Sequence, residues 1–172
     1  MAHVQPGALP EDALLRVYTR AGDYTDCYMA EVARPVSLAE YIDAFYRTPL
    51  FRLERWILAW LVAKPSTDAQ VRELAQGRRD TFAAWHVESR AADQLLLCDF
   101  RRSTRSWLMV LAAREGTVLH FGSAVVRAKK SANGEKRLSV AFWLMLGLHK
   151  LYSRALLALA RRALIRTADA RG

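Results

Sequence analysis

The chain has 172 residues, of which 52% are hydrophobic and 25% charged, and its formal net charge is +9 at pH 7. This length is typical of one domain with a single core, and the five tryptophans exclude a disordered chain, because disordered segments lack the apolar surface that offsets ordering entropy. The charge allows a nucleic-acid or membrane surface, but an arginine-rich surface without a binding role explains it equally well, and the lack of any DNA- or RNA-recognition motif argues against nucleic acid.

The N-terminal residues contain Pro6, Pro10, Glu11 and Asp12, and they have neither the basic nor the apolar region of a secretory signal. We therefore expect a cytoplasmic protein, with residues 1–20 as a loosely ordered arm and residues 21–168 as a single domain. Residues 23–33, DYTDCYMAEVA, alternate with the period of two that is typical of a strand.

Helices are predicted after this strand. Ser37 and Glu40 have the S-x-x-E spacing of a capping box, and Thr67 and Gln70 repeat that form, so one helix begins after each pair. Between them, a proline after Thr48 predicts a further helix through about residue 62. The sequence thus indicates two or three helices after the first strand.

Residues 81–128 change period. Four runs rich in Val, Leu, Phe and Trp, at 81–90, 93–101, 105–115 and 117–128, are separated by short turn-like breaks. This pattern predicts a meander of antiparallel strands. Several of these runs are apolar on both sides, so the pattern leaves open which face each side chain takes.

The most apolar stretch is Leu138–Leu164, and it ends the predicted domain. Its longest run without charge has 11 residues, whereas a membrane span needs about 20. On a helical period, Phe142, Met145, His149 and Tyr152 lie on one stripe together with Leu138, Leu156, Leu159 and Ala163. We expect a helix that covers the sheet with this stripe inward.

A strand, then helices, then a meander and a long last helix is also the chain order of the helix-grip fold. The sequence resembles that superfamily, called START-like or SRPBCC, and more narrowly a family of uncharacterised bacterial proteins with a domain of unknown function. The resemblance lies in Asp23-Tyr24-Thr25-Asp26, in Asp99-Phe100-Arg101, and in an aromatic, basic last helix with Tyr152 near its middle. It departs at residues 158–160, Ala-Leu-Ala, where many members have Pro-Phe-His.

The resemblance implies an α+β fold in which an antiparallel sheet wraps around the C-terminal helix, with a hydrophobic cavity between them. The implied function is binding of an apolar or amphipathic small molecule. Candidate ligand-binding residues are His149, Tyr152, Met145, Phe142, Trp85, Trp107 and Phe100. His149 and Tyr152 are neighbours on the helix and can orient a ligand, although two core residues with satisfied hydrogen bonds explain them as well.

Two alternatives stay open. A pocket enzyme of the cyclase or hydrolase type would use Asp26, Asp99 or His149 as acid or base, but an ion pair of the two carboxylates with Arg101 or Arg105 is favoured. No catalytic motif is present, so catalysis stays undecided.

The other alternative is a basic docking module. Arg127, Lys129, Lys130, Lys136 and Arg137 would then meet an anionic membrane or an acidic partner, and a homodimer is a further possibility. We expect neither a cofactor nor a metal, because His86, His120, His149 and Cys98 form no close ligand pair. Cys27 and Cys98 lie in apolar stretches far apart, which favours buried free thiols.

Overall fold

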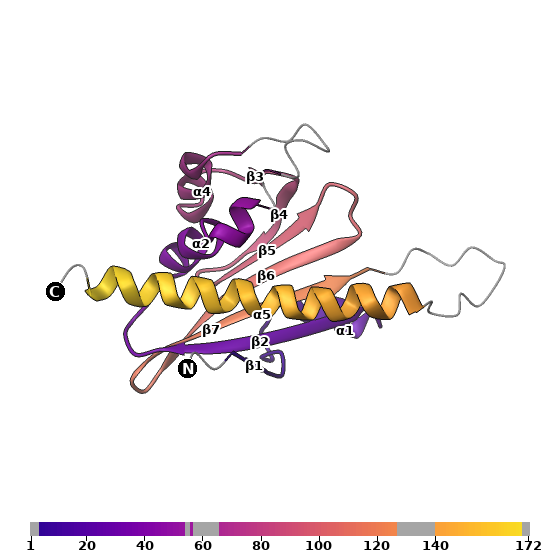
Figure 1. The fold of residues 1–172 in the computed structure, drawn as a ribbon, viewed down its shortest axis with the longest axis horizontal. Helices are drawn as coiled ribbons and strands as arrows, with labels where there is room; N and C mark the ends of the chain where they lie inside the picture. Colours follow the sequence, from indigo (N-terminus) through magenta and orange to yellow (C-terminus); the bar gives the residue numbers. More distant parts are fainter. Residues whose placement is uncertain (1–3, 54–55, 57–65, 127–139, 170–172) are drawn as a thin grey trace.

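The protein has an α+β fold built on one antiparallel sheet (Figure 1). The computed structural model describes residues 4–53, 56, 66–126 and 140–169, with the backbone alone for 140–148 and 168–169. Seven strands of this part of the chain lie in the order β1-β2-β7-β6-β5-β4-β3. Their bounds are β1 Gln5–Pro6, β2 Tyr24–Val32, β3 Thr81–Phe82, β4 Trp85–Arg90, β5 Gln94–Asp99, β6 Thr104–Ala113 and β7 Gly116–Val125. The helices are α1 Arg16–Arg20, α2 Leu38–Tyr46, α4 Asp68–Ala75 and α5 Val140–Asp169, and residues 49–53 are also helical.

Both predicted capping boxes are confirmed. The Ser37 hydroxyl accepts the Glu40 amide, and the Glu40 carboxylate accepts the Ser37 amide, which starts α2 at Leu38. Thr67 and Gln70 make the same pair of bonds at the start of α4. These bonds satisfy amides that have no partner inside the helix, so they fix where each helix begins. Most of the predicted helix at 50–62 lies outside the described residues.

The predicted strands are found, but the sequence missed two short ones. β1 comes from the N-terminal segment and pairs with β2 through Gln5 and Pro6. β3 arises because the run at 81–90 is broken at Ala83, whose φ of 51° turns the chain back so that Phe82 pairs with Trp85. Among the described residues the sheet therefore has seven strands rather than the smaller number that the hydrophobic pattern indicated.

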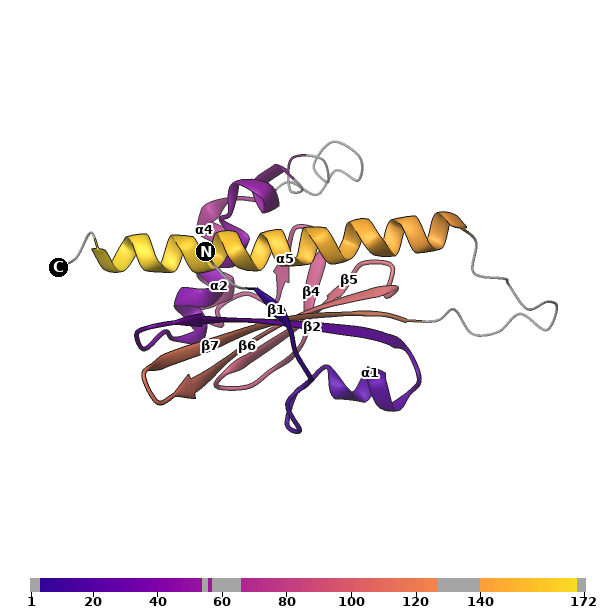
Figure 2. The same cartoon turned by 60° about the horizontal axis from the view of Figure 1, so that its bottom comes forward.

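The helices are divided between the two faces of the sheet (Figure 2). α5 runs along the face above β2 and β7, with α2 beside it on the same face, and α1 lies on the opposite face. We call the face covered by α5 the inner face and the other the outer face. Because side chains alternate along a strand, each strand contributes to both.

The inner face carries the main core, in which Tyr41, Ile42 and Phe45 of α2 pack against Leu108 of β6 and Phe121 of β7. The buried stripe of α5 consists of Ser153, Leu156, Leu157, Ala160 and Leu164. The predicted stripe was therefore partly wrong: Leu159 and Ala163 are half-buried, while Leu156 is shared. In this part of the helix apolar residues recur on several sides between the basic ones, so periodicity alone does not select the buried side.

The outer face has a second, smaller core. Trp107 of β6 and Met109 pack there with Leu15, which precedes α1 and is fully buried. The Leu14 amide donates to the Gln94 side chain, which also accepts the Trp107 indole N–H. Within residues 4–20, which the sequence predicts to be a loose arm, Leu15 and Ala13 thus pack on the sheet, and Gln5 and Pro6 pair with it.

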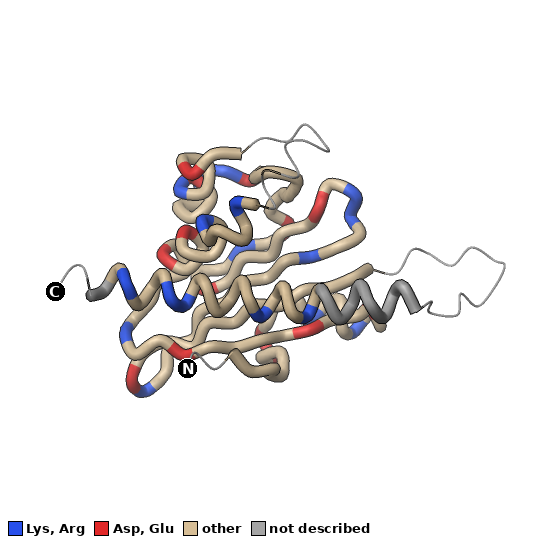
Figure 3. The backbone as a smooth tube through the Cα atoms, viewed as in Figure 1, with Lys and Arg blue, Asp and Glu red and all other residues tan. Residues whose placement is uncertain are grey.

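Basic residues recur along α5, where residues 149–167 include five Lys and Arg and no Asp or Glu (Figure 3). Despite its length, α5 does not qualify as a membrane span: no helix in the described part of the chain combines enough length with enough hydropathy to cross a bilayer.

Candidate functional site

A cavity of about 410 Å³ lies between α5 and the inner face of the sheet. Aromatic side chains from α2, the helical turn after it, β4 and β7 form much of its wall: Phe45, Phe51, Trp85 and Phe121. The cavity is also lined by His149, Tyr152 and Leu156 of α5 and by Ser123 of β7. A mainly apolar pocket with a few convergent polar groups is the usual form of a small-molecule site.

The aromatic wall is held by ring-to-ring contacts. Phe45 lies 4.8 Å from Phe121 and 6.3 Å from Phe51, measured between ring centroids. Phe45 comes from the inward stripe of α2, whereas Phe121 reaches the same point because alternate residues of β7 face inward. These contacts join the helical layer to the sheet on one side of the cavity.

A hydrogen-bonded network of Asp26, Ser123 and His149 crosses from β2 through β7 to α5. Asp26 Oδ1 accepts the Ser123 amide at 3.0 Å and lies 2.6 Å from the Ser123 hydroxyl. That hydroxyl is 2.7 Å from Nε2 of His149. Asp26 and Ser123 are direct partners in the β2–β7 register, so both side chains point from the inner face toward the helix. The network fastens α5 to the sheet beside the cavity.

Counting protons fixes the direction of these bonds. An ionised carboxylate can only accept, so the Ser123 hydroxyl donates its proton to Asp26. That proton is then not available to His149, and Nε2 of His149 must donate to Ser123. A hydrolytic serine instead gives its proton to a histidine, which the carboxylate orients from the far side. The three residue types match a hydrolase triad, but their order does not, so Ser123 is not an activated nucleophile here.

Asp26 is the electrostatic centre of this region. Its side chain is 9% exposed, its Oδ2 has no hydrogen bond within the described residues, and that oxygen lies 3.8 Å from Nε2 of His149. Burial, reinforced by the Asp26 charge, raises the pKa of Tyr24 to about 12 and also raises the pKa of Tyr28.

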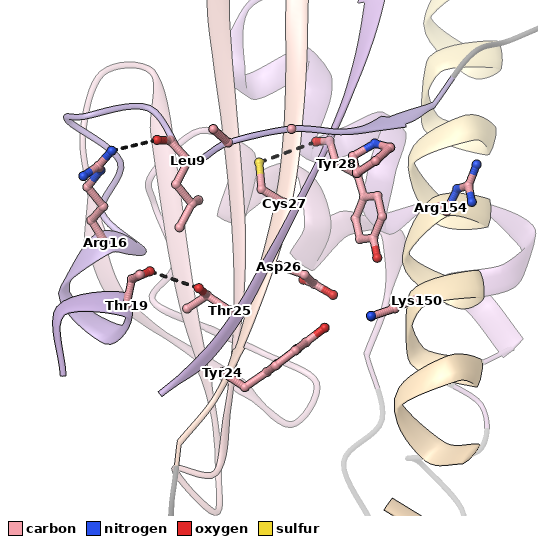
Figure 4. A pocket seen from close by; sticks show the side chains of 13 residues that line it. Leu9, Arg16, Thr19, Tyr24, Thr25, Asp26, Cys27, Tyr28, Lys150 and Arg154 are labelled. Atoms are coloured by element: carbon pink, nitrogen blue, oxygen red, sulfur yellow. Dashed lines mark hydrogen bonds between the residues drawn. The ribbon is translucent and has the colours of Figure 1, made fainter. Parts of the chain in front are cut away.

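A second opening lies on the other side of α5, at the edge formed by β1 and β2 (Figure 4). This groove measures about 700 Å³ and is lined by Tyr24, Asp26 and Tyr28 of β2 and by Lys150 and Arg154 of α5. In Figure 4 the three β2 side chains point toward α5. The Asp26–Ser123–His149 network therefore lies beneath the helix between this groove and the aromatic cavity.

The structure brings together some of the predicted site residues. His149, Tyr152 and Trp85 line the cavity, and their role in ligand binding stays a prediction. Trp107 does not, because it alternates with Ser106 and Leu108 and therefore points to the outer face. Phe100 is 49% exposed at the turn after β5, with the Arg101 guanidinium 5.4 Å from its ring centroid. The side chains of Phe142 and Met145 lie outside the described residues.

The predicted ion pairs were wrong for both carboxylates. Asp99 accepts the amides of Ser103 and Thr104 and so caps the turn before β6. Arg105 instead pairs with Glu88 on the outer face, where its Nε lies 2.6 Å from the carboxylate and also donates to the Tyr18 hydroxyl. The cause is again strand alternation, which puts Arg105 and Asp26 on opposite faces.

Sequence reasoning missed Ser123, Phe45 and Phe51. The signal for Ser123 was available in part, since it shares the period-two face of Leu119 and Phe121 and is the polar position on that side of an apolar run. Its partner Asp26 is 97 residues away, which no local pattern reveals. The basic segment from Arg127 to Arg137 lies outside the described residues, so its docking role stays a prediction.

The described residues contain no group of three or more His, Cys, Asp or Glu side chains placed to hold a metal ion. Cys27 and Cys98 are buried free thiols, as predicted. No family model matches this chain, and no curated protein is significantly similar to it.

Proposed function

We propose that this protein binds an apolar or amphipathic small molecule in the cavity between α5 and the sheet, and that its fold is of the helix-grip type. The observation that carries the proposal is the cavity itself, with aromatic walls and a small set of polar groups at α5. Its volume of about 410 Å³ falls within the roughly 300–1,000 Å³ usual for ligand pockets.

Topology supports the helix-grip part of the proposal. The first long strand, β2, pairs with the last strand, β7, after an excursion through α2 and α4, and the meander from β4 to β7 completes the sheet. α5 then covers the inner face of this sheet, opposite α1. A binding role fits the site better than hydrolysis, because the serine of the network has already committed its proton to Asp26.

The test is a calorimetric titration with 2-methylnaphthalene, an apolar two-ring probe. The Leu156→Trp variant should lose binding, because the larger side chain fills the cavity from α5. Leu151→Trp is the matched control, since Leu151 lies on the same helix and is 67% exposed. It should bind like the unmodified protein.

Leu156 is also a core residue, so a second filling variant is needed. Val125→Trp narrows the cavity from a half-buried position at the end of β7 and should also lose binding. Thermal melting establishes that each variant is folded. The proposal would be contradicted if Leu156→Trp and Val125→Trp were folded and bound 2-methylnaphthalene as tightly as Leu151→Trp does. It would also be contradicted if the unmodified protein did not bind 2-methylnaphthalene.

A further inference from the structure

We propose that the cavity ligand carries an acidic hydroxyl group, phenolic or enolic, which donates a hydrogen bond to Nδ1 of His149. This inference rests on the proposed function and names the chemical class of the ligand. It follows from the hydrogen bonds of the Asp26–Ser123–His149 network and from the aromatic walls around it.

The first step concerns the free nitrogen of His149. Nε2 donates to the Ser123 hydroxyl, so in the neutral ring the lone pair is on Nδ1. No described residue donates to Nδ1, and this atom is not among the buried polar atoms that lack a partner. The His149 side chain is 35% exposed and lines the cavity. Nδ1 is thus an accessible acceptor, and its complement is a donor on the ligand.

The second step concerns the strength of that bond. When a ligand hydroxyl shares its proton with Nδ1, positive charge develops on the ring. Asp26 Oδ2, 3.8 Å from Nε2 and otherwise without a hydrogen bond in the described part of the chain, stabilises this charge. The benefit grows with the acidity of the hydroxyl, so a phenol or enol is favoured over an aliphatic alcohol. Full transfer would leave the proton on Nδ1 and a phenolate or enolate in the cavity.

The third step concerns the body of the ligand. Phe45, Phe51, Phe121 and Trp85 present ring faces and edges, which pack most favourably with another aromatic ring. Leu156 and Tyr152 of α5 and Val125 of β7 also line the cavity. An aromatic molecule with one hydroxyl therefore matches both the walls and the acceptor, whereas a fully apolar ligand leaves Nδ1 without a partner.

The test compares 2-naphthol with 2-methylnaphthalene, which has a methyl group in place of the hydroxyl. The unmodified protein should bind 2-naphthol about tenfold more tightly, the difference expected for one hydrogen bond with partial ionic character. In His149→Phe this preference should disappear while 2-methylnaphthalene still binds. His149→Leu, which also lacks an acceptor, serves if the phenylalanine variant does not fold, as judged by melting.

Asp26 is tested as a positioning residue. Asp26→Asn should reduce the preference for 2-naphthol without weakening 2-methylnaphthalene, and long-range ¹H–¹⁵N spectra of the unmodified protein should show His149 protonated at Nε2. Protonation at Nδ1 alone in the neutral ring would overturn the inference. Equal affinities for the two probes, or a preference that survives in both His149 variants, would overturn it and leave the proposed function standing. Failure of both probes to bind would refute the proposed function and this inference with it.

Discussion

Leu15 gives a direct test of whether the N-terminal segment belongs to the fold. Its side chain is 0% exposed and packs on the outer face of the sheet, against Trp107 and above Gly122. A Cβ atom added at Gly122 would lie 2.9 Å from a Leu15 methyl carbon, which shows how closely the leucine covers the strand. Leu15→Ala removes these contacts and leaves a space beside two other core side chains.

The expected cost is about 3–5 kcal/mol of unfolding free energy, because the lost transfer energy and the new cavity both contribute at a fully buried leucine. For a chain of this size, each kcal/mol lowers the melting temperature by roughly 2–4 °C. The control is Val17→Ala, which lies on α1 and is 57% exposed, and it should cost less than about 0.5 kcal/mol. Urea unfolding of both variants measures the difference. Similar small losses in both would refute the packing of residues 4–20 on the sheet.

Three further predictions concern the core and its titratable groups. Leu156→Asp should prevent folding, because Leu156 is buried on the inward side of α5 and an unpaired charge there costs several kcal/mol. The control Arg161→Asp loses one hydrogen bond to a backbone carbonyl and should still give a cooperative melt. If circular dichroism showed both variants to be equally folded, the inward side of α5 would be misplaced. Burial raises the pKa of the Cys27 thiol to about 12, so at pH 8 little of it is thiolate. Cys27 should therefore react with a disulfide reagent roughly a thousandfold more slowly in the folded than in the unfolded protein. A reaction rate near that of a free thiol would contradict the burial of Cys27. Burial also lowers the pKa of His120, so the unfolded chain protonates this imidazole at a higher pH than the folded protein, and the corresponding stability is present above about pH 6.5 and is lost as the pH falls below it. Urea unfolding at pH 8 and pH 5.5 should show a smaller pH effect on the unfolding free energy of His120→Leu than on that of the unmodified protein. An unchanged or larger effect in the variant would argue against the lowered pKa of His120.

Local signals in the sequence determined most of the elements. The capping boxes at Ser37 and Thr67 fix helix starts through bonds to residues three positions away, so a short window of sequence contains both partners. The period of two at residues 23–33 and the apolar runs after residue 81 likewise indicate strands. The last helix, predicted for residues 138–164, is found at Val140–Asp169.

The tertiary structure decided which faces meet. β5 and β6 are apolar on both sides, so a period-two pattern could not tell that Trp107 points outward while Leu108 points inward. The outward choice depends on Leu15, which covers that face from a segment that the sequence predicts to be loose. The two facts are linked, because Leu15 and Trp107 belong to the same buried cluster on the outer face.

The candidate site shows the same division. Residue type in the sequence pointed to His149, Tyr152 and Trp85, and these three line the cavity. For Asp26, however, the sequence favoured an ion pair with Arg101 or Arg105, which the structure does not form. Register places Asp26 opposite Ser123, and the position of α5 brings His149 within hydrogen-bonding distance of Ser123. Residue chemistry is therefore readable from the chain alone. Hydrogen-bond partners 97 and 26 residues apart are fixed by strand pairing and helix packing, which no local pattern encodes.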